Sequence, residues 1–470
     1  MSSEYNLVVI GNTPEAIEAA VAAVRLKARV ALVKQSFPQQ LGTAQTIFQR
    51  QFNQAVRLSQ QLAVLNNANI SPPISRFDWQ LSHLQAHAQE VTAIIGERYD
   101  ASILPALGID VISAAGEFCR LPRLAFIAGK RRLYSRAYLI ATGFHYAMPE
   151  IPGLAAVGCL TPGDLSQAEA VSSLPQDLAI VGDTAVALEL AVNLALIGKN
   201  VTLIVEKNKI LPQEEPEAAR LIQAQLEAVG VRLLVGSAVM QVRQIDGKKW
   251  LQVENWAIES DEIILTTPAV PNVEGLNLAG VGVKWKGSGI ERNDKLQTAN
   301  PRIYACGSAD VPNLSRYEAA VAVRNALFFF PCFRLDVDYL PQVMFTYPPL
   351  ARVGMTEVQA REVYGRQVLT TQQPYKILPA AQILGETSGF CKLVAHRNGK
   401  ILGGHSVGAE VGEFIGIVAL AMRQKLKVNQ LANLFLPDLT LSKILQETSR
   451  QWQYQRFKNN TLWQNLLQML

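Results

Sequence analysis

The same local pattern occurs twice in this chain: a short apolar run, a tight turn that begins with glycine, and a longer run with helical periodicity. The turns begin at Gly11 and Gly182. A dinucleotide-binding turn needs a first glycine for the tight turn, a second so that main chain can approach a pyrophosphate, and a third, or an alanine, for helix packing. Both turns keep the third position, as Ala16 and Ala187. The pattern predicts two βαβ units, each in a parallel sheet.

Threonine occupies the second position in both turns, as Thr13 and Thr184. A side chain therefore stands where a phosphate would normally approach the main-chain N–H groups at a helix N-terminus. We expect the architecture of a dinucleotide-binding protein, with an altered ligand contact.

The rest of the chain divides into further segments. A helical region is expected from about residue 48 to 96, broken by the prolines in 71–73, and residues 149–153 mark a linker. A helix is expected over 317–330, and from about residue 341 short β runs are followed by helices. The sequence thus predicts an α/β chain with two Rossmann-like dinucleotide-binding domains and a C-terminal α+β domain.

Length and composition narrow the class of protein. The chain has 470 residues, of which 49% are hydrophobic and 18% charged, and its net charge is +5. This is the balance of a folded protein of about three domains, without the basic blocks of a nucleic-acid binder. Its five cysteines are scattered and none has CxxC spacing, so we expect neither a structural metal nor a redox pair. Isolated thiols and the lack of a secretory signal or membrane-length apolar run predict a cytoplasmic protein.

The order of several motifs along the chain carries a family resemblance. The motifs comprise the two βαβ units, Ala141-Thr142-Gly143, Glu189 in the second unit, Tyr304-Ala-Cys-Gly307, and segments 343–357 and 389–403. Together they resemble the flavin-dependent pyridine nucleotide disulfide oxidoreductases, the group of glutathione reductase, dihydrolipoamide dehydrogenase and mercuric reductase. The likeness runs nearly end to end, and mercuric reductase-like members are the most similar.

The resemblance implies a domain organisation and a homodimer. The expected segments are an FAD-type domain (1–153 and 271–335), an NAD-type domain (154–270), a dimerisation domain (336–450) and an amphipathic tail (451–470). In the tail, residues 462–470 place apolar side chains on one helical face. This face would pack within the dimer or dock on a protein partner or a membrane surface.

The family's redox cysteines are absent at the matching positions. The resemblance places them at Ala44 and Gln49, and the lysine that follows them at Asn53. Disulfide exchange through a thiolate is therefore excluded by that route, and we assign no catalytic residue. Glu189, which would pair with that lysine near the flavin, is interpreted as a helix residue only.

The FAD contacts implied by the resemblance are also changed. Lys34 stands where an acid would bind the ribose hydroxyls, and it would instead contact a phosphate or lie in solvent. After Gly307, an aspartate that would hold the flavin side chain is replaced by Ser308. Thr142 and Gly143 complete the FAD-type turns.

The NAD contacts are better kept. Glu206 ends a predicted strand, where an acid would favour NADH over NADPH, although residues 206–209 also read as a polar turn. Asp183 adds a negative charge inside the phosphate turn.

Two pairs of polar residues allow a functional and a structural interpretation. His83 and His87 are four residues apart and could bind a metal, but without a third ligand we predict a polar helix face and no metal. Asp438 and Lys443 stand where the family has its catalytic His-Glu pair, and we expect at most a surface ion pair.

Two hypotheses on function follow. The chain is an NADH-linked FAD oxidoreductase with a non-disulfide acceptor, or it is a catalytically inactive paralogue that serves as a dimeric scaffold or regulatory subunit. The number of altered contacts favours the second.

Overall fold

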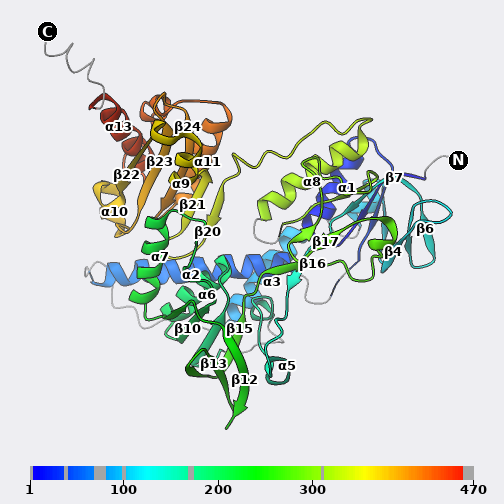
Figure 1. Cartoon of the computed structure of the whole chain (residues 1–470), viewed down its shortest axis with the longest axis horizontal. Helices are drawn as coiled ribbons and strands as arrows, with labels where there is room; N and C mark the ends of the chain where they lie inside the picture. The colour runs from blue at the N-terminus through cyan, green and yellow to red at the C-terminus, as the bar shows by residue number, and fades with distance from the viewer. Residues whose placement is uncertain are drawn as a thin grey trace. The chain divides into compact units, whose positions relative to one another are not determined.

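The computed structural model contains two compact units of α/β structure (Figure 1). It describes residues 4–35, 37, 41–67, 81–97, 102–167, 174–308 and 312–458. The first unit combines Met1–Gln51, Gln80–Leu174 and Ile264–Leu335, and the second combines Phe52–Trp79, Pro175–Ile263 and Asp336–Leu470.

A five-stranded parallel sheet forms the centre of the first unit, in the order β19-β7-β1-β2-β3. Its strands are β1 (Tyr5–Ile10), β2 (Val30–Val33), β3 (Ile109–Ile112), β7 (Ser135–Ile140) and β19 (Ile303–Ala305). The strands are continuous apolar runs because both faces of the sheet are covered. Leu7 and Val9 pack with α1 (Pro14–Arg25) and α8 (Pro312–Leu327), whereas Val8 and Ile10 face a second apolar cluster.

Short strands and helices complete the first unit. A three-stranded antiparallel sheet covers the second apolar cluster with its Phe118 and Phe126. These strands are β4 (Gly116–Cys119), β5 (Ala125–Ala128) and β6 (Arg131–Leu133), and the two-stranded ladders are β8 (Phe144–Tyr146) with β16 (Ala269–Pro271) and β17 (Trp285–Lys286) with β18 (Gly289–Ile290). The helices are α3 (Leu81–Glu97), α4 (Ile103–Ala106) and α5 (Leu154–Val157); α2 (Thr43–Asn67) passes from the first unit into the second.

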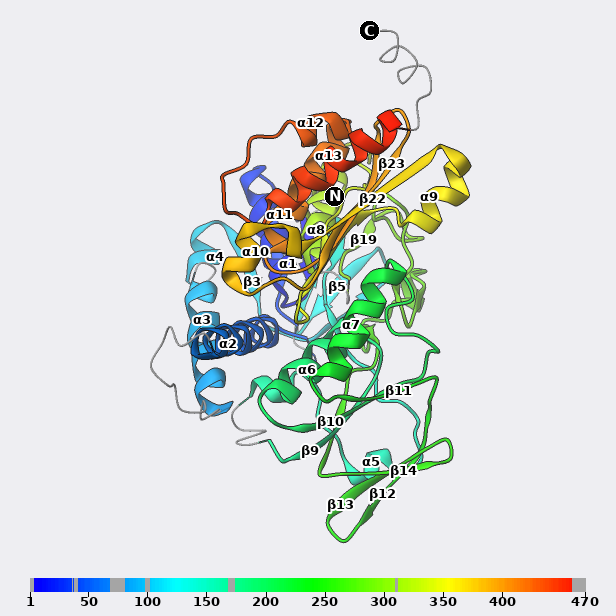
Figure 2. The same ribbon diagram turned by 90° about the vertical axis from the view of Figure 1, so that its left-hand side faces the viewer.

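The second unit begins with the other βαβ pattern, in a four-stranded sheet of order β11-β10-β9-β15. Its strands are β9 (Asp177–Val181), β10 (Asn200–Val205), β11 (Arg232–Val235) and β15 (Glu262–Leu265). Helix α6 (Ala185–Leu196) packs on β9 and β10, and α7 (Pro216–Ala228) packs on β11 (Figure 2). An antiparallel sheet of β12 (Val239–Ile245), β13 (Lys248–Val253) and β14 (Trp256–Ser260) follows.

The C-terminal part of the second unit is a five-stranded antiparallel sheet, in the order β20-β21-β24-β23-β22. Its strands are β20 (Gln342–Met344), β21 (Leu350–Gly354), β22 (Val368–Pro374), β23 (Phe390–His396) and β24 (Ile401–Val407). The helices are α9 (Glu357–Tyr364), α10 (Pro379–Leu384), α11 (Val411–Arg423), α12 (Val428–Ala432) and α13 (Lys443–Lys458). Helices α11 and α13 cover one face, where Trp452 is fully buried.

The structure confirms the α/β class and both βαβ units. The expected helical region is present as α2 and α3, and the break at 71–73 lies outside the described residues. The helix predicted over 317–330 instead runs from Pro312 to Leu327. It ends early because the Asn325 side chain bonds the N–H and the carbonyl of Phe333, which turns the chain back. Residues 462–470 also lie outside the described residues, and no helix in the described part is long and apolar enough to cross a membrane.

Candidate functional site

The Gly11 turn lies at the point where the strand order of the first sheet reverses. Strand β1 has β2 on one side and β7 on the other, so the turns after β1 and β7 meet at the carboxyl edge, where open α/β sheets bind ligands. Gly11 has φ +140°, and a Cβ there would lie 1.9 Å from the carbonyl oxygen of Ala141. Glycine is therefore required by the close approach of these two turns, whatever the ligand.

Thr13 and Thr184 both act as helix N-caps. The Thr13 hydroxyl accepts from the N–H of Ala16 at 3.2 Å and donates to Ala141 O at 3.0 Å, and the side chain is 2% exposed. Thr184 accepts from the N–H of Ala187 at 3.3 Å. Each threonine thus takes one of the helix N–H groups that the fingerprint would leave for a phosphate. Threonine directly before a helical run is the sequence signal for this cap.

The Thr142–Gly143 turn is held by a residue that sequence reasoning missed. The buried Asn272 donates through Nδ2 to Thr142 O at 3.0 Å, and its carbonyl accepts from the Thr142 hydroxyl at 2.7 Å. His145 Nδ1 lies 2.6 Å from Asn272 Oδ1. Lys34 follows β2 at the same edge, and its N–H donates to Ile112 O. The predicted residues after β1, β2 and β7 are therefore brought to one edge.

At the Gly307 turn, Arg292 and Glu318 take the main-chain groups. Gly307 N–H donates to Glu318 Oε2 at 2.8 Å, and Arg292 bonds Glu318 Oε1 at 2.6 Å and Gly307 O at 3.1 Å. Ser308 N–H donates to the Ser315 hydroxyl at 2.8 Å. Burial raises the pKa of Glu318, which the Arg292 charge opposes. Sequence reasoning missed this ion pair, because no spacing rule links residues 292 and 318.

The first turn fits a dinucleotide only in part. The backbone of the Gly11 turn is kept, and Gln49 Nε2 is a buried donor without an acceptor among the described residues, which suits a polar ligand group. Against this, the Gly307 N–H is already bonded, and Glu15 places a carboxyl in the first turn of α1. Burial raises the pKa of Glu15, which reduces its negative charge near a phosphate.

Glu189 is more than a helix residue, which corrects the sequence interpretation. Its side chain is buried; Oε2 accepts from Asn53 Nδ2 at 3.2 Å and Oε1 from the N–H of Phe345 at 2.6 Å. Asn193 in turn donates to Asn53 Oδ1. A neutral amide at position 53 therefore replaces the family's lysine and still satisfies Glu189.

The second glycine turn carries a compensated charge. Gly182 has φ +142°, as Gly11 does, and Lys207 Nζ lies 2.5 Å from Asp183 Oδ2. The negative charge expected inside this turn is thus neutralised in part. Glu206 is exposed directly after β10.

All five cysteines are free thiols. Cys306 and Cys391 are buried, and burial raises the pKa of Cys306 well above its ordinary value and that of Cys391 to about 12. A thiol with a raised pKa is a poor nucleophile. These two cysteines therefore cannot replace a redox pair.

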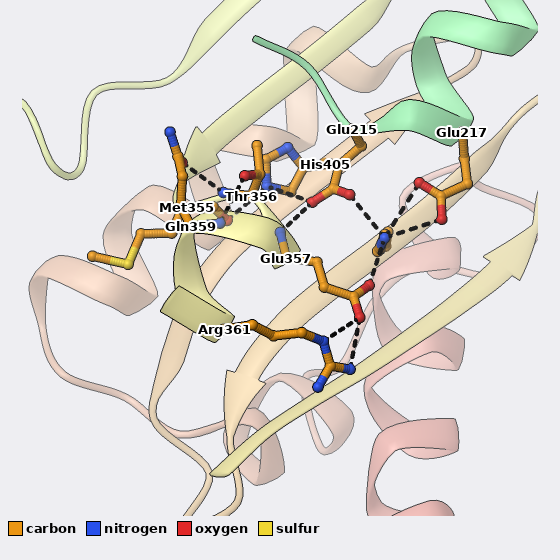
Figure 3. A network of polar contacts seen from close by, with 9 residues as sticks. Glu215, Glu217, Met355, Thr356, Glu357, Gln359, Arg361 and His405 are labelled. Atoms are coloured by element: carbon orange, nitrogen blue, oxygen red, sulfur yellow. Dashed lines mark hydrogen bonds and ion pairs between the residues drawn. The ribbon is translucent and has the colours of Figure 1, made fainter. Parts of the chain in front are cut away.

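A polar network crosses one face of the C-terminal sheet (Figure 3). Gln342, Arg352, His405 and Lys392 are successive cross-strand neighbours on β20, β21, β24 and β23. They share one face because side chains on adjacent strands align in register. Lys392 is a lone charge in an otherwise apolar strand, which is the sequence signal that could have identified it.

The acidic segment before α7 binds this row of side chains. Lys392 Nζ lies 2.8 Å from Glu215, 3.3 Å from Glu217 and 2.9 Å from Glu357, while Arg352 pairs with Glu214 at 3.1 Å. Burial alone would lower the pKa of Lys392, but the bonds to Glu215 and Glu357 outweigh it and raise the pKa. Lys392 therefore stays charged and acts as a fixed cation, not as a base.

His405 lies beside the same carboxylate. It is 3% exposed; Nε2 lies 2.9 Å from Met355 O and 3.7 Å from Glu215 Oε1, and Nδ1 has no partner among the described residues. Burial lowers the pKa of His405. The neutral tautomer that carries its proton on Nε2 fits these contacts.

The remaining polar pairs are on the surface. His87 lies 3.5 Å from Glu90 on α3, both exposed, and the described residues contain no group of three or more His, Cys, Asp or Glu side chains that could hold a metal. Asp438 and Lys443 form the expected exposed ion pair.

These features define an α/β protein with two dinucleotide-type turns and a C-terminal sheet domain, and comparison with known proteins identifies its family. A sequence model of the pyridine nucleotide-disulphide oxidoreductases matches residues 5–325, and the model of that family's dimerisation domain matches residues 340–449. The chain therefore belongs to the pyridine nucleotide-disulphide oxidoreductase family.

Individual relatives agree with this assignment. Mercuric reductase of Staphylococcus aureus is 30% identical over 452 residues, covering 94% of this chain and 81% of that protein. Dihydrolipoyl dehydrogenase of Bacillus subtilis (strain 168) is 29% identical over 291 residues, covering 60% and 63%. Among solved structures, the Cu(II) complex of the HOCl-induced flavoprotein disulfide reductase RclA from Escherichia coli has a TM-score of 0.82 at 22% identity, covering 96% of this chain and 100% of that chain. This last likeness concerns the fold alone.

Proposed function

We propose that this chain is a dinucleotide-binding member of its family that works without dithiol chemistry. Ala44 and Gln49 on α2 stand where the family's redox cysteines are expected, and the first cysteine of the chain is Cys119. The two buried cysteines have raised pKa values and cannot supply a thiolate.

The Gly11 turn is the observation that supports retained binding. It keeps the required backbone at the strand-order reversal, next to the unpartnered donor Gln49 Nε2 on α2 of the same unit. FAD bound there would supply electron transfer between a nicotinamide and a quinone, dye or protein acceptor. The N-terminus of α1 would hold the pyrophosphate, and Glu206 would accept from the ribose of NADH.

A second candidate is an inactive dimeric scaffold or regulatory subunit. It is favoured by the Gly307 N–H, which Glu318 already occupies, and by Lys34, which cannot accept from ribose hydroxyls. The match to the dimerisation domain supports a homodimer under either function. We further propose the four segments given above as domains, a cytoplasmic location, and a tail that serves the dimer or a protein partner.

Purification without added cofactor separates the two functions. A flavin absorption spectrum, with FAD released on denaturation, and oxidation of NADH with a quinone or dye acceptor are expected for the first. A colourless protein that also fails to take up added FAD would contradict it and leave the scaffold function.

A further inference from the structure

A cavity of about 590 Å³ opens in the first unit, at the edge of its parallel sheet opposite the glycine turns. It lies where β7 begins, at Ser135 and Arg136, and just before β19, at Pro301 and Arg302. Because β7 has six residues, about 20 Å separates the cavity from the turns at the other end of the strand. The cavity is therefore distinct from the dinucleotide site (β7 and α8 in Figure 1).

Three arginines line the cavity without any acidic residue. Arg123 lies over the ring of Tyr134, with 3.8 Å from its Cζ to the ring centroid. Arg136 donates to Phe328 O at 2.8 Å, and Arg302 donates through Nε to Arg136 O at 3.1 Å. Within the described part of the chain, none of the three guanidinium groups is paired with a carboxylate, and Arg123 makes no hydrogen bond. Several N–H donors thus remain for a ligand.

Aromatic side chains form the rim of the same cavity. Phe328 and Phe329 both line it, and they are 51% and 81% exposed. Exposed aromatic rings next to unpaired guanidinium groups suit a ligand that is flat and apolar at one end and anionic at the other. A volume near 590 Å³ is within the usual range for small-molecule sites.

We propose that this cavity binds an aromatic phosphate of mononucleotide size. The phosphate would contact Arg123 and Arg136, since guanidinium groups bind phosphate oxygens in pairs. The aromatic ring would stack on Phe329. A phosphate dianion suits the site better than a single carboxylate, because three cationic groups face the cavity without a counter-charge.

The test is calorimetric titration of the full chain with adenosine monophosphate as the probe. Arg123→Gln should weaken binding about tenfold or more, because a charged hydrogen bond is lost. The matched control is Arg132→Gln, which removes the same charge from an exposed arginine that bonds Leu121 O and does not line the cavity. It should leave the affinity unchanged. Adenosine and inorganic phosphate, which each lack one half of the probe, should bind more weakly.

A second variant and a mapping measurement keep the outcome clear. Phe329→Ala, at an exposed position, should fold normally and weaken binding about fivefold or more. Hydrogen exchange should show protection of residues 123–137 by the probe, and saturating NADH or FAD should not displace it. Absence of binding at millimolar probe, equal affinity in Arg123→Gln and wild type, displacement by FAD, or phosphate binding as tightly as the probe would each overturn the proposal.

Discussion

Lys392 and Glu215 form a buried ion pair, 2.8 Å long, between side chains that are 4% and 1% exposed. Glu215 belongs to the part of the chain that matches the oxidoreductase model, and Lys392 to the part that matches the dimerisation domain. The pair thus joins the two matched parts within the second unit, with Glu357 and Glu217 as further partners of Lys392. Buried charges of this kind specify one arrangement, because removing either leaves the other without a counter-charge.

Lys392→Met should destabilise the protein by about 3–5 kcal/mol, because Glu215 would remain buried and unpaired. Chemical denaturation measures this loss. The matched control is Lys443→Met, which breaks the exposed pair with Asp438 and should cost about 1 kcal/mol or less. Adding Glu215→Gln to Lys392→Met should restore part of the stability. Equal costs for the two lysine variants would contradict this account of the pair.

The stability should fall as the pH decreases below about 6.5, the ordinary pKa of histidine. Burial lowers the pKa of His405 in the folded protein, so the unfolded chain binds a proton that the folded one excludes. The groups that face His405 are Glu215, Arg352 and Lys392. Below about 4.5, Glu357 adds to the loss: burial alone would raise its pKa, but its bonds to Lys392 and Arg361 outweigh this and lower the pKa.

Denaturation midpoints at several pH values in wild type and His405→Gln measure the histidine contribution. The variant should lose less stability than wild type between pH 6.5 and 5. Parallel curves for the two proteins would show that another group causes the dependence.

Gly11→Ala should destabilise the first unit by about 4 kcal/mol or more, because the added Cβ would overlap Ala141 O. Gly108→Ala is the control, since Gly108 also has positive φ but nothing lies within 4 Å of its Cβ position. It should cost about 1–2 kcal/mol. Similar costs at both positions would show that backbone strain alone, and not the approach of β7, requires Gly11.

Thr13→Gly should bind FAD more tightly than wild type, because it frees the N–H groups at the start of α1 and restores the fingerprint glycine. The cost in stability should be about 1 kcal/mol, from the lost bond to Ala141 O. Thr184→Gly makes the same change in the other turn and should leave FAD affinity unaltered. An FAD titration compares the three proteins; unchanged or weaker binding in Thr13→Gly would contradict this role for the threonine.

The sequence predicted what depends on local pattern. Both βαβ units and the glycine turns follow from periodicity and turn chemistry, so the turns at Gly11 and Gly182 were located correctly. The family's collinear motifs likewise located the C-terminal sheet.

The contacts that are distant in sequence were not predicted. The Glu318 carboxylate on Gly307, the Asn272 bonds to Thr142 and the Lys392 network depend on packing between segments, which no local spacing encodes. Glu189 was underestimated for the same reason. Its partner changed from the expected lysine to Asn53, and only the structure shows that the buried carboxylate is still satisfied.

The central claim is that this family member binds FAD without a dithiol, and anaerobic reduction by NADH tests it most directly. The FAD-loaded protein should accept about two electrons per flavin, because no disulfide is present to take up a further pair. Uptake of about four electrons per flavin would reveal a redox-active cysteine pair and contradict the absence of dithiol chemistry. Failure to bind FAD at all would contradict the retained site at Gly11.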